Sequence, residues 1–570
     1  MVVYSDKVLD LARKFVNAYN DYRFTINEQR ALNFFFSNLD FRVFFMHRFP
    51  ANIGATLLAM FSRIKNPRGI RGLFVDSFLP QFLATGLPEV EKEFGGNEVA
   101  FLKARGITSL DQFINYSADS AMLFQEFYDG MGGAHAIYFK EFAESKKAKK
   151  FLTMWLDKYG HNSIARVGSL WVCFEGISIL AAKSLEWNRP GSGFIELSTR
   201  YVDMSGKGCY PVELELEAGW GVPPQGILQQ NEFSFSCYGQ LAGNNFDGML
   251  PSYLRKKFGH LFDSALKDLE SGVIGETCDV LGNLLPTSTL TSVGVSVSGE
   301  AFPAMLRHLL LDNTPENIAL VELTVKESKK VGADQFARHY EPTEWEVFAR
   351  PYVPMSEFSS LALESCPVVK QLIPEILRMN NHSVAEQFVK MVTGIKRGEF
   401  DKLPRSFELM VSPTFLGIMS FRGWRDLQRQ GLCTHMRTLL APSLGFYSYD
   451  KLAGDGPSSS FLSDSFDRVA SSNWALYNGM LDSGVPPILA QYPMALGHNI
   501  GFVVGANLRQ WEFCNWQRTK FSVNHEVRQV FLAVENSLRD VLPWWQHVSR
   551  ADTTPAYVFA RGESGVPLLT

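Results

Sequence analysis

The sequence lacks the short motifs that mark metal, redox and phosphate-loop sites. Its seven cysteines are isolated, and no CxxC, HExxH, GxGxxG or GxxxxGKS/T pattern occurs. We therefore expect neither a metal site built from neighbouring ligands nor a P-loop. An odd number of scattered cysteines is typical of reduced thiols, which favours a cytoplasmic protein.

Long apolar runs and an excess of positive charge are also missing. No uncharged apolar stretch reaches the roughly 18 residues of a membrane-spanning helix, so we expect no membrane segment. The first residues show no basic stretch followed by an apolar one, so we expect no signal peptide. The formal net charge of −4 argues against a nucleic-acid polymer as partner. An anionic small molecule would have to be held by a local group of arginines.

What the sequence does contain is one pattern that occurs twice. An Asn-Ser or His-Ser turn lies at Ser163 and again at Ser383, 220 residues later. A Ser-Gly-Val step begins at Ser271 and again at Ser483, 212 residues later. The two spacings agree to within the length of a loop, so we interpret the chain as an internal duplication of a domain-sized unit.

The expected fold class is α+β, with helices dominant and a small antiparallel sheet in each copy. Helical periodicity runs through residues 1–110, which we interpret as an N-terminal helical extension. Within it, the arginines near Asn66–Gly72 are expected in a solvated loop. The first copy is placed at residues 111–335 and the second at residues 336–570.

Each copy is expected to contain a strand followed by a helix. In the first copy the strand is predicted at 170–174 and the helix at 177–187. In the second copy the strand is predicted at 407–411, and the helix at 414–424, directly after Pro413. Both Ser-Gly-Val steps are expected to be turns.

The richest polar loop follows the first of these helices. It reads Glu196-Leu-Ser-Thr-Arg-Tyr201 and comes directly after Gly191-Ser-Gly193. Hydroxyls, backbone N–H groups and a guanidinium together suit a phosphate ester. For an isolated loop the commoner alternative is structural, because an arginine often only bridges backbone carbonyls.

A second group of charges lies in the second copy. Arg422, Arg425 and Arg429 would share one face of a continuous helix. This face either binds an anion or is solvated and ion-paired. Arg509 and Arg518 follow later, and their spacing places them on opposite faces of a straight helix.

Together these motifs resemble the flavin-dependent thymidylate synthases, also called thymidylate synthase complementing proteins. The first copy matches in its Gly-His-x-Ser turn and its Glu-Leu-Ser-x-Arg-Tyr loop but departs at the family's Arg-His-Arg turn, where it has Trp187-Asn-Arg189. The second copy matches in its Ser-Gly-Val-Pro step and Asn-x-Arg helix, and Arg422-Gly-Trp-Arg425 stands in place of Arg-His-Arg. Its Ser-x-Arg-Tyr loop is reduced to His435-Met-Arg-Thr438.

The resemblance implies methylation of dUMP to dTMP, with FAD as cofactor and methylene-tetrahydrofolate and NADPH as co-substrates. No catalytic nucleophile of the enzyme is expected, because the flavin carries the hydride. The implied substrate-binding residues are Glu196, Ser198, Arg200, Tyr201, Arg509 and Arg518. The implied cofactor-binding residues are His161, Ser163, Arg189, Ser383, Glu386, Arg422, Arg425 and Asn507.

The family assembles as homotetramers whose active sites are shared between subunits, so a duplicated chain is expected to form a homodimer. The first copy keeps the Arg200 loop, but its last helix ends among leucines, Leu309–Leu311. The second copy keeps Arg518. This division suggests composite sites. Two alternatives remain: a flavin- and folate-dependent reaction on another pyrimidine or small metabolite, and a non-catalytic paralogue.

Overall fold

The computed structural model describes most of the chain. The described residues are 2–18, 23–62, 66–131, 150, 154, 162–187, 191–200, 202–262, 266–348, 352, 355–358, 368–371, 389–390, 393, 397–398, 401–453, 458–560 and 565–568.

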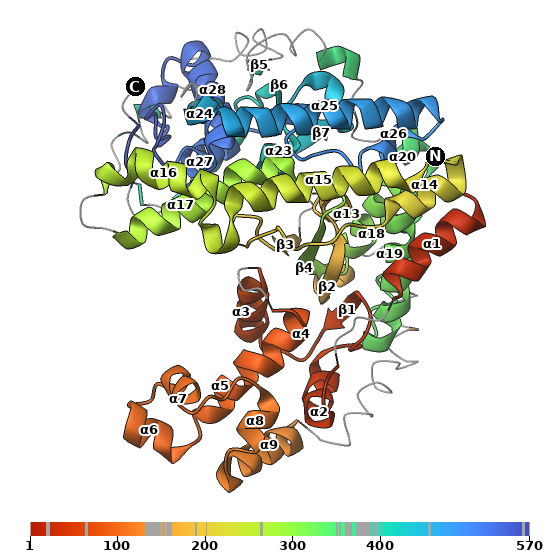
Figure 1. The fold of residues 1–570 in the computed structure, drawn as a ribbon, viewed down its shortest axis with the longest axis vertical. Helices are drawn as coiled ribbons and strands as arrows, with labels where there is room; N and C mark the ends of the chain where they lie inside the picture. Colours follow the sequence, from red (N-terminus) through yellow and green to blue (C-terminus); the bar gives the residue numbers. More distant parts are fainter. Residues whose placement is uncertain are drawn as a thin grey trace. The chain divides into compact units, whose positions relative to one another are not determined.

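The chain forms two compact units, and both are discontinuous in sequence. The first unit contains residues 1–198 and 290–347, and the second contains residues 199–289 and 348–570. Each unit has a four-stranded antiparallel sheet with helices packed on it (Figure 1). The α+β prediction is therefore confirmed.

The two sheets have the same topology. The strand order is β1-β2-β4-β3 in the first unit and β5-β6-β8-β7 in the second. The first-unit strands are β1 (Val43–Met46), β2 (Ser169–Ser178), β3 (Ser192–Glu196) and β4 (Leu290–Ser298). The second-unit strands are β5 (Val368–Gln371), β6 (Thr414–Ser420), β7 (Thr434–Arg437) and β8 (Asn499–Gly505). The two units thus share one sheet topology, as an internal duplication would give.

Alternating side chains on the first sheet divide its two faces between two cores. Val172 and Phe174 of β2 pack among helices of the repeated domain, whereas Cys173 packs among the N-terminal helices. The helices on the first face are α1 (Asp6–Val16), α13 (Ile179–Leu185), α18 (Ala301–Asp312) and α19 (Pro315–Ser328); α12 (Asn162–Arg166) precedes β2.

The N-terminal extension is mostly helical, as predicted, but it also supplies β1. Strand β1 pairs with β2, so Phe44 and Met46 join the N-terminal core. The helices of this region are α2 (Ile26–Phe35), α3 (Ala51–Phe61), α4 (Gly69–Leu73), α5 (Leu79–Ala84), α6 (Pro88–Phe94), α7 (Glu98–Ala104), α8 (Leu110–Ile114) and α9 (Ala118–Gly130).

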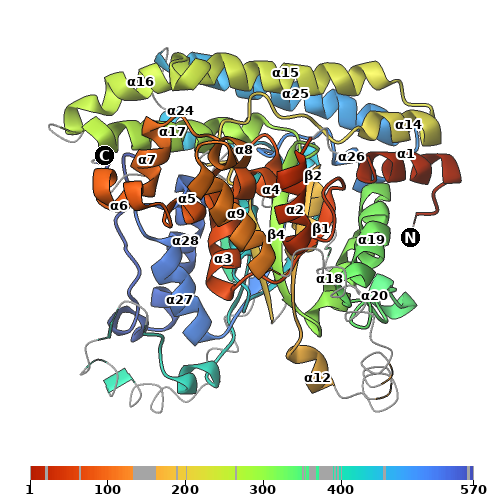
Figure 2. The ribbon, with the colours of Figure 1, turned by 90° about the horizontal axis from the view of Figure 1, so that it is seen from below.

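In the second unit, two long helices lie side by side, α15 and α25 (Figures 1 and 2). Arg468 of α25 lies over the Phe233 ring of α15, with 4.8 Å from Cζ to the ring centroid. The helices of this unit are α14 (Val212–Trp220), α15 (Pro224–Ala242), α16 (Met249–Phe258), α17 (Leu266–Leu281), α23 (Phe421–Gln428), α24 (Asp450–Ala453), α25 (Ser460–Asp482), α26 (Pro487–Ala490), α27 (Leu508–Arg518) and α28 (His525–Val541).

The strand predicted at 407–411 and the helix predicted at 414–424 were both wrong in part, because the strand of the structure begins where the helix was predicted to begin. The 414–420 segment, predicted as helix, is the central strand β6, and the predicted strand begins within a 3-10 turn at Arg405–Glu408. Because β6 is covered on both faces, its sequence is a continuous apolar run, which does not distinguish a strand from a buried helix. Similarly, Ser271 lies inside α17 and is no turn, whereas Ser483 lies in the turn that ends α25, so the turn predicted there is confirmed.

A serine and a glutamate fix the start of the same helix in both units. Ser178 caps α13 and donates from N and Oγ to Glu316 of α19, at 2.8 and 2.6 Å. Ser420 caps α23 and makes the same two bonds to Glu526 of α28. All four residues are fully buried, so the carboxylates satisfy donors that would otherwise be stranded away from water.

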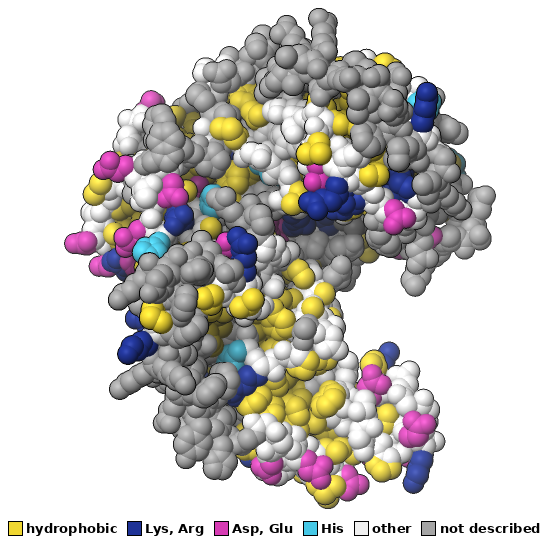
Figure 3. All heavy atoms as spheres, turned by 180° about the vertical axis from the view of Figure 1, so that it is seen from behind, with side chains coloured by type: hydrophobic (Ala, Val, Ile, Leu, Met, Phe, Trp, Pro, Cys, Tyr) yellow, Lys and Arg dark blue, Asp and Glu magenta, His cyan; other side chains and the backbone are white. Residues whose placement is uncertain are grey.

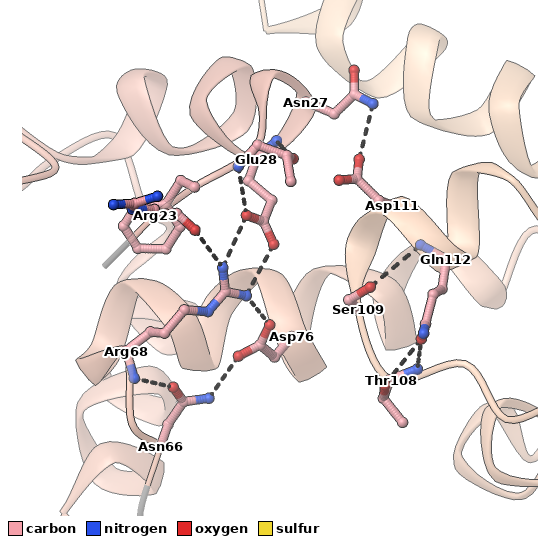
Figure 4. Close-up of polar contacts among 12 residues, drawn as sticks. Arg23, Asn27, Glu28, Asn66, Arg68, Asp76, Thr108, Ser109, Asp111 and Gln112 are labelled. Atoms are coloured by element: carbon pink, nitrogen blue, oxygen red, sulfur yellow. Dashed lines mark hydrogen bonds and ion pairs between the residues drawn. The ribbon is translucent and has the colours of Figure 1, made fainter. Parts of the chain in front are cut away.

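The arginines near Asn66–Gly72 are ion-paired rather than solvated. Arg68 forms a bidentate pair with Glu28 at 2.9 Å and also contacts Asp76 (Figure 4). Burial lowers the pKa of Arg68, but the two carboxylates raise it by more than burial lowers it. The pKa of Arg68 therefore lies above its usual value. Arg71 is fully buried and pairs with Glu175 at 3.1 Å. The predicted solvated loop is therefore wrong at both arginines.

Candidate anion-binding site

Two arginines of the second unit meet at Asp279. Arg200, from the loop after β3, donates from Nε and Nη2 to the two Asp279 oxygens, at 2.8 and 2.9 Å. Arg422, in the first turn of α23, donates from Nη2 to Asp279 Oδ1 at 3.0 Å and to the Cys278 carbonyl at 3.1 Å. Asp279 lies near the end of α17 and its side chain is fully buried. It therefore joins two arginines that are distant in sequence.

Asp426 of α23 is the second carboxylate of this cluster. Burial raises its pKa, but the charges of Arg518, Arg200 and Arg429 outweigh burial and lower it to about 2. Burial also lowers the pKa of Arg518, which ends α27. Arg200 and Arg518, on which the predicted composite site depends, thus act on the same carboxylate.

We define the arginine cluster as Arg200, Arg422, Arg429 and Arg518, together with Asp279 and Asp426. Four guanidinium groups face two carboxylates, so the cluster carries an excess of positive charge. Among the described residues, no acceptor lies within hydrogen-bonding distance of the buried Arg422 Nε. The surplus of guanidinium groups over carboxylates is what would suit an anionic ligand with several acceptor oxygens.

The helix that ends in Arg518 separates the two arginines predicted on it. Asn507 caps α27 by accepting from Gln510 N at 2.9 Å. Arg509, in the first turn, donates to Glu408 and to the Leu403 carbonyl, both at 2.6 Å. The predicted opposite faces are therefore correct, and Arg509 lies in an ion pair away from the cluster.

Glu196 is held in a different environment, inside the first unit. Its side chain is fully buried and accepts from Lys183 Nζ at 2.8 Å, and Lys183 also pairs with Glu186. A carboxylate with this partner is a structural ion pair of the core. Ser198 donates from its backbone N to the Ser62 carbonyl at 3.0 Å.

Of the cofactor-binding residues predicted from the sequence, Arg422 and Arg425 are buried on α23 and Asn507 caps α27. Ser163 lies in α12, where only its backbone is described. The other predicted residues lie outside the described residues: His161, Arg189, Tyr201, Ser383 and Glu386.

Two equivalences inferred from the sequence were shifted. Glu196 pairs with Val293 of β4, and Arg437 pairs with Phe502 at the same position of β8, so Arg437 corresponds to Glu196 and not to Arg200. Arg422 follows the cap Ser420 and so lies at the start of a helix, whereas an Arg-His-Arg turn would follow the helix.

Sequence reasoning missed Asp279 as a functional candidate. It lies near the end of a helical sequence, in the segment Glu276-Thr-Cys-Asp279, which has no motif. Tyr449 was also missed; burial raises its pKa well above the usual value, and the charges of Glu276 and Asp279 add to this. Only the tertiary structure brings these groups to the arginines.

The N-terminal helices carry a separate, small pocket. Hydrophobic side chains gather over this region in the lower part of Figure 3. The pocket has a volume of about 200 Å³ and lies between α2 and α9, where Arg30 Cζ is 4.0 Å from the centroid of the Tyr128 ring. It contains none of the predicted site residues.

The chain matches a known protein family over part of its length. Residues 118–331 match the thymidylate synthase complementing protein family. The predicted family resemblance is confirmed, and the matched segment includes Arg200 and Asp279. Arg422, Asp426 and Arg518 come from outside it.

Relatives extend the similarity over both copies. The chain is 24% identical to the UPF0159 protein of Chlamydia muridarum, with 72% of this chain and 82% of the relative covered. It is 23% identical to a UPF0159 protein of Chlamydia pneumoniae, covering 86% and 88%. It is 21% identical to a UPF0159 protein of Thermoplasma acidophilum, covering 72% and 90%. Within the described part of the chain, no helix has the length and apolarity needed to cross a membrane.

Proposed function

We propose that this protein is a thymidylate synthase-like enzyme that methylates dUMP to dTMP. FAD is the proposed cofactor, and methylene-tetrahydrofolate and NADPH are the proposed co-substrates. The observation that carries the proposal is the arginine cluster, in which Arg200 from the family-matched segment and Arg518 from the second copy act on one carboxylate. The family match supports the reaction class.

Arg200 and Arg518 are the proposed groups for the nucleotide phosphate, with Arg422 beside them. Arg422 Nε has no acceptor among the described residues, and the cluster has excess positive charge. A phosphate monoester carries close to two negative charges at neutral pH and offers three strong acceptor oxygens. Such a group complements the cluster without displacing Asp279 from Arg200.

The bound flavin would supply hydride transfer, and this chain would supply its orientation and electrostatics. Arg422 and Arg425 are the described residues with the chemistry to hold a diphosphate, because both are buried cations on α23. Asn507 would act indirectly, because its side-chain oxygen already caps α27.

An acceptor other than dUMP is the second candidate. Asp279 already engages Arg200 through two hydrogen bonds, which leaves that arginine fewer donors for a phosphate dianion. A pyrimidine substrate with less charge would need fewer of these donors.

Flavin and nucleotide binding together test the proposal. FAD added to the purified chain should give bound flavin absorbance and raise the melting temperature, because a ligand bound to the native state stabilises it. Calorimetric titrations with dUMP, dCMP and uridine should then rank the pyrimidines, with dUMP binding most tightly. A protein that stays colourless and shows no shift with FAD would contradict the enzyme assignment. A preference for another pyrimidine would favour the second candidate.

The proposed assembly is a homodimer with four family-like domains. Duplication places two copies in one chain, so two chains supply what four single-copy subunits would. Light scattering of the full chain should give the mass of a dimer; the mass of a tetramer would contradict this arrangement.

A further inference from the structure

Two cysteines of the second unit face each other beside Arg518. Cys433 Sγ and Cys514 Sγ are 3.9 Å apart, and both are free thiols. A disulfide bond has an S–S length of about 2.05 Å, so the sulfurs need to approach by only about 2 Å. The described cysteines offer no comparable pairing elsewhere.

The two thiols differ in their access to solvent. Cys514 is fully buried in α27. Cys433 is 7% exposed and lies in the loop before β7, directly after Leu432, which is 65% exposed. A small displacement of this loop exposes Cys433 while Cys514 stays within the helix, so Cys433 is the thiol that meets a reagent first.

The pair is connected to Arg518 through Gln430. One end of the Gln430 carboxamide lies 3.2 Å from Cys514 Sγ, and the other end lies 2.8 Å from Arg518 Nε and 2.9 Å from its Nη2. Because a guanidinium only donates hydrogen bonds, the carboxamide oxygen belongs at the Arg518 end.

The backbone strengthens this connection. Cys433 N donates to the Gln430 carbonyl at 2.9 Å, so displacement of Cys433 pulls on Gln430. Cys514 lies one helical turn before Arg518 on the same face of α27. Any movement that joins the sulfurs therefore acts on Gln430, which contacts the Arg518 guanidinium, and on the helix that carries Arg518.

The geometry points to a thiol–disulfide switch: a Cys433–Cys514 disulfide that weakens anion binding at Arg518. The inference rests on the proposed function of the arginine cluster and adds regulation of that site. The oxidant is a low-molecular-weight disulfide, RSSR.

The exchange proceeds in two balanced steps. The Cys433 thiolate attacks one sulfur of RSSR, which forms a mixed disulfide and releases RS⁻. The Cys514 thiolate then attacks Cys433 Sγ, which closes the protein disulfide and releases the second RS⁻. The two protons of the protein thiols end on the two released RSH molecules. The hydrogen bond with Cys514, together with burial, raises the pKa of Cys433, so the first step should be faster at alkaline pH.

The test compares the reduced full-length chain with the chain treated with oxidised glutathione. Mass spectrometry of alkylated peptides should identify a Cys433–Cys514 link. Titration calorimetry should show dUMP affinity reduced about fivefold to tenfold, the scale of coupling between residues in contact. Dithiothreitol should restore the affinity. Cys433→Ser should be insensitive to oxidised glutathione, and Cys237→Ser, a matched buried cysteine on α15, should respond like the unmodified chain.

The inference is overturned if no such disulfide forms, or if it forms and dUMP affinity is unchanged. If reduced protein does not bind dUMP at all, the proposed function fails, and inorganic phosphate becomes the probe of the Arg518 site. A phosphate-induced rise in melting temperature that is smaller in the oxidised protein then supports the switch. An equal rise, or none in either form, contradicts it. If Cys433→Ser unfolds, Cys433→Ala provides the same control.

Discussion

The two units share one scaffold but differ in the charges placed on it. In both, a central strand leads into a helix that is capped by a serine and anchored by a glutamate from the last long helix, Ser178 with Glu316 and Ser420 with Glu526. The sheets have the same strand order. These shared features are ones that the fold itself needs.

The two units can be aligned by the residues that cap their matching helices. In this alignment, four charged residues of the arginine cluster correspond to residues of the first unit that do not form such a cluster. Ser178 corresponds to Ser420, and Ser298 corresponds to Asn507, because each of the latter two accepts from the backbone N three residues later. The replaced pairs are Arg422 with Leu180, Asp426 with Ser184, Arg429 with Trp187, and Arg518 with Leu309.

The first unit also has a buried cation at one of these positions, but that cation is ion-paired within the unit. Lys183 occupies the position that Arg425 has in the second unit, and it is neutralised by Glu186 and Glu196. We infer from this difference that the two scaffolds took separate roles. The first unit pairs its buried charges internally, whereas the second unit holds the arginine cluster that the proposed ligand would need.

The largest expected effect is a loss of stability when the capping glutamate of either unit is removed, and the loss should be equal in the two units. Glu316→Ala and Glu526→Ala each remove the acceptor of two buried donors, and each should lower the free energy of unfolding by about 3–5 kcal/mol. Urea unfolding followed by circular dichroism measures this. Glu322→Ala removes a half-exposed partner of Arg13 and should cost less than about 1 kcal/mol. If only one of the two glutamate variants shows a large loss in the free energy of unfolding, the two scaffolds are not equivalent.

A smaller effect should separate the units by binding. Arg518→Ala should weaken dUMP binding by about 1.5–3 kcal/mol, the scale of a hydrogen bond to a charged group. Arg307→Ala, on α18 of the first unit, breaks an ion pair with Glu346 at 3.0 Å and should leave dUMP affinity within about twofold. Calorimetry with both variants measures the difference. Equal losses would contradict the assignment of nucleotide binding to Arg518.

The smallest expected effect is on stability in acid. The folded-state pKa of Asp426 is depressed to about 2, so its stabilising contribution is present above about pH 4 and is lost as the pH falls towards 2. The contribution should be roughly 1–2 kcal/mol. Urea unfolding between pH 5 and pH 2 should show a steeper loss in the unmodified chain than in Asp426→Asn. Parallel curves would contradict the electrostatic role of Asp426.

The sequence predicted those parts of the fold that local pattern determines. The amphipathic α1 was found from its helical periodicity, and the strand around Val172 was found from a short run of bulky apolar residues. β6 was taken for a helix because a strand buried on both faces has no alternation. β1 was missed because a four-residue strand in a helical region carries little signal, and its partner β2 lies more than a hundred residues away.

The candidate site also contains residues that the sequence predicted and residues that it could not predict. Arg200, Arg422 and Arg518 were predicted from motif resemblance, and the structure brings them around Asp279 and Asp426. Asp279 could not be predicted, because it is one acidic residue among many on helices. Only the tertiary structure brings the loop after β3, with Arg200, and the start of α23, with Arg422, to it. Arg509 could not be excluded before Glu408 was located beside it.

The central claim is that Arg200 and Arg518, one from each copy, serve one nucleotide site. Titration of dUMP into Arg200→Ala, Arg518→Ala and the double variant tests it most directly, with circular dichroism to verify that each variant is folded. Each single variant should lose binding, and the double variant should be no worse, because groups that act as one unit are not additive. If each single variant instead loses half of the binding stoichiometry and keeps the remaining affinity, the copies hold separate sites and the claim is wrong.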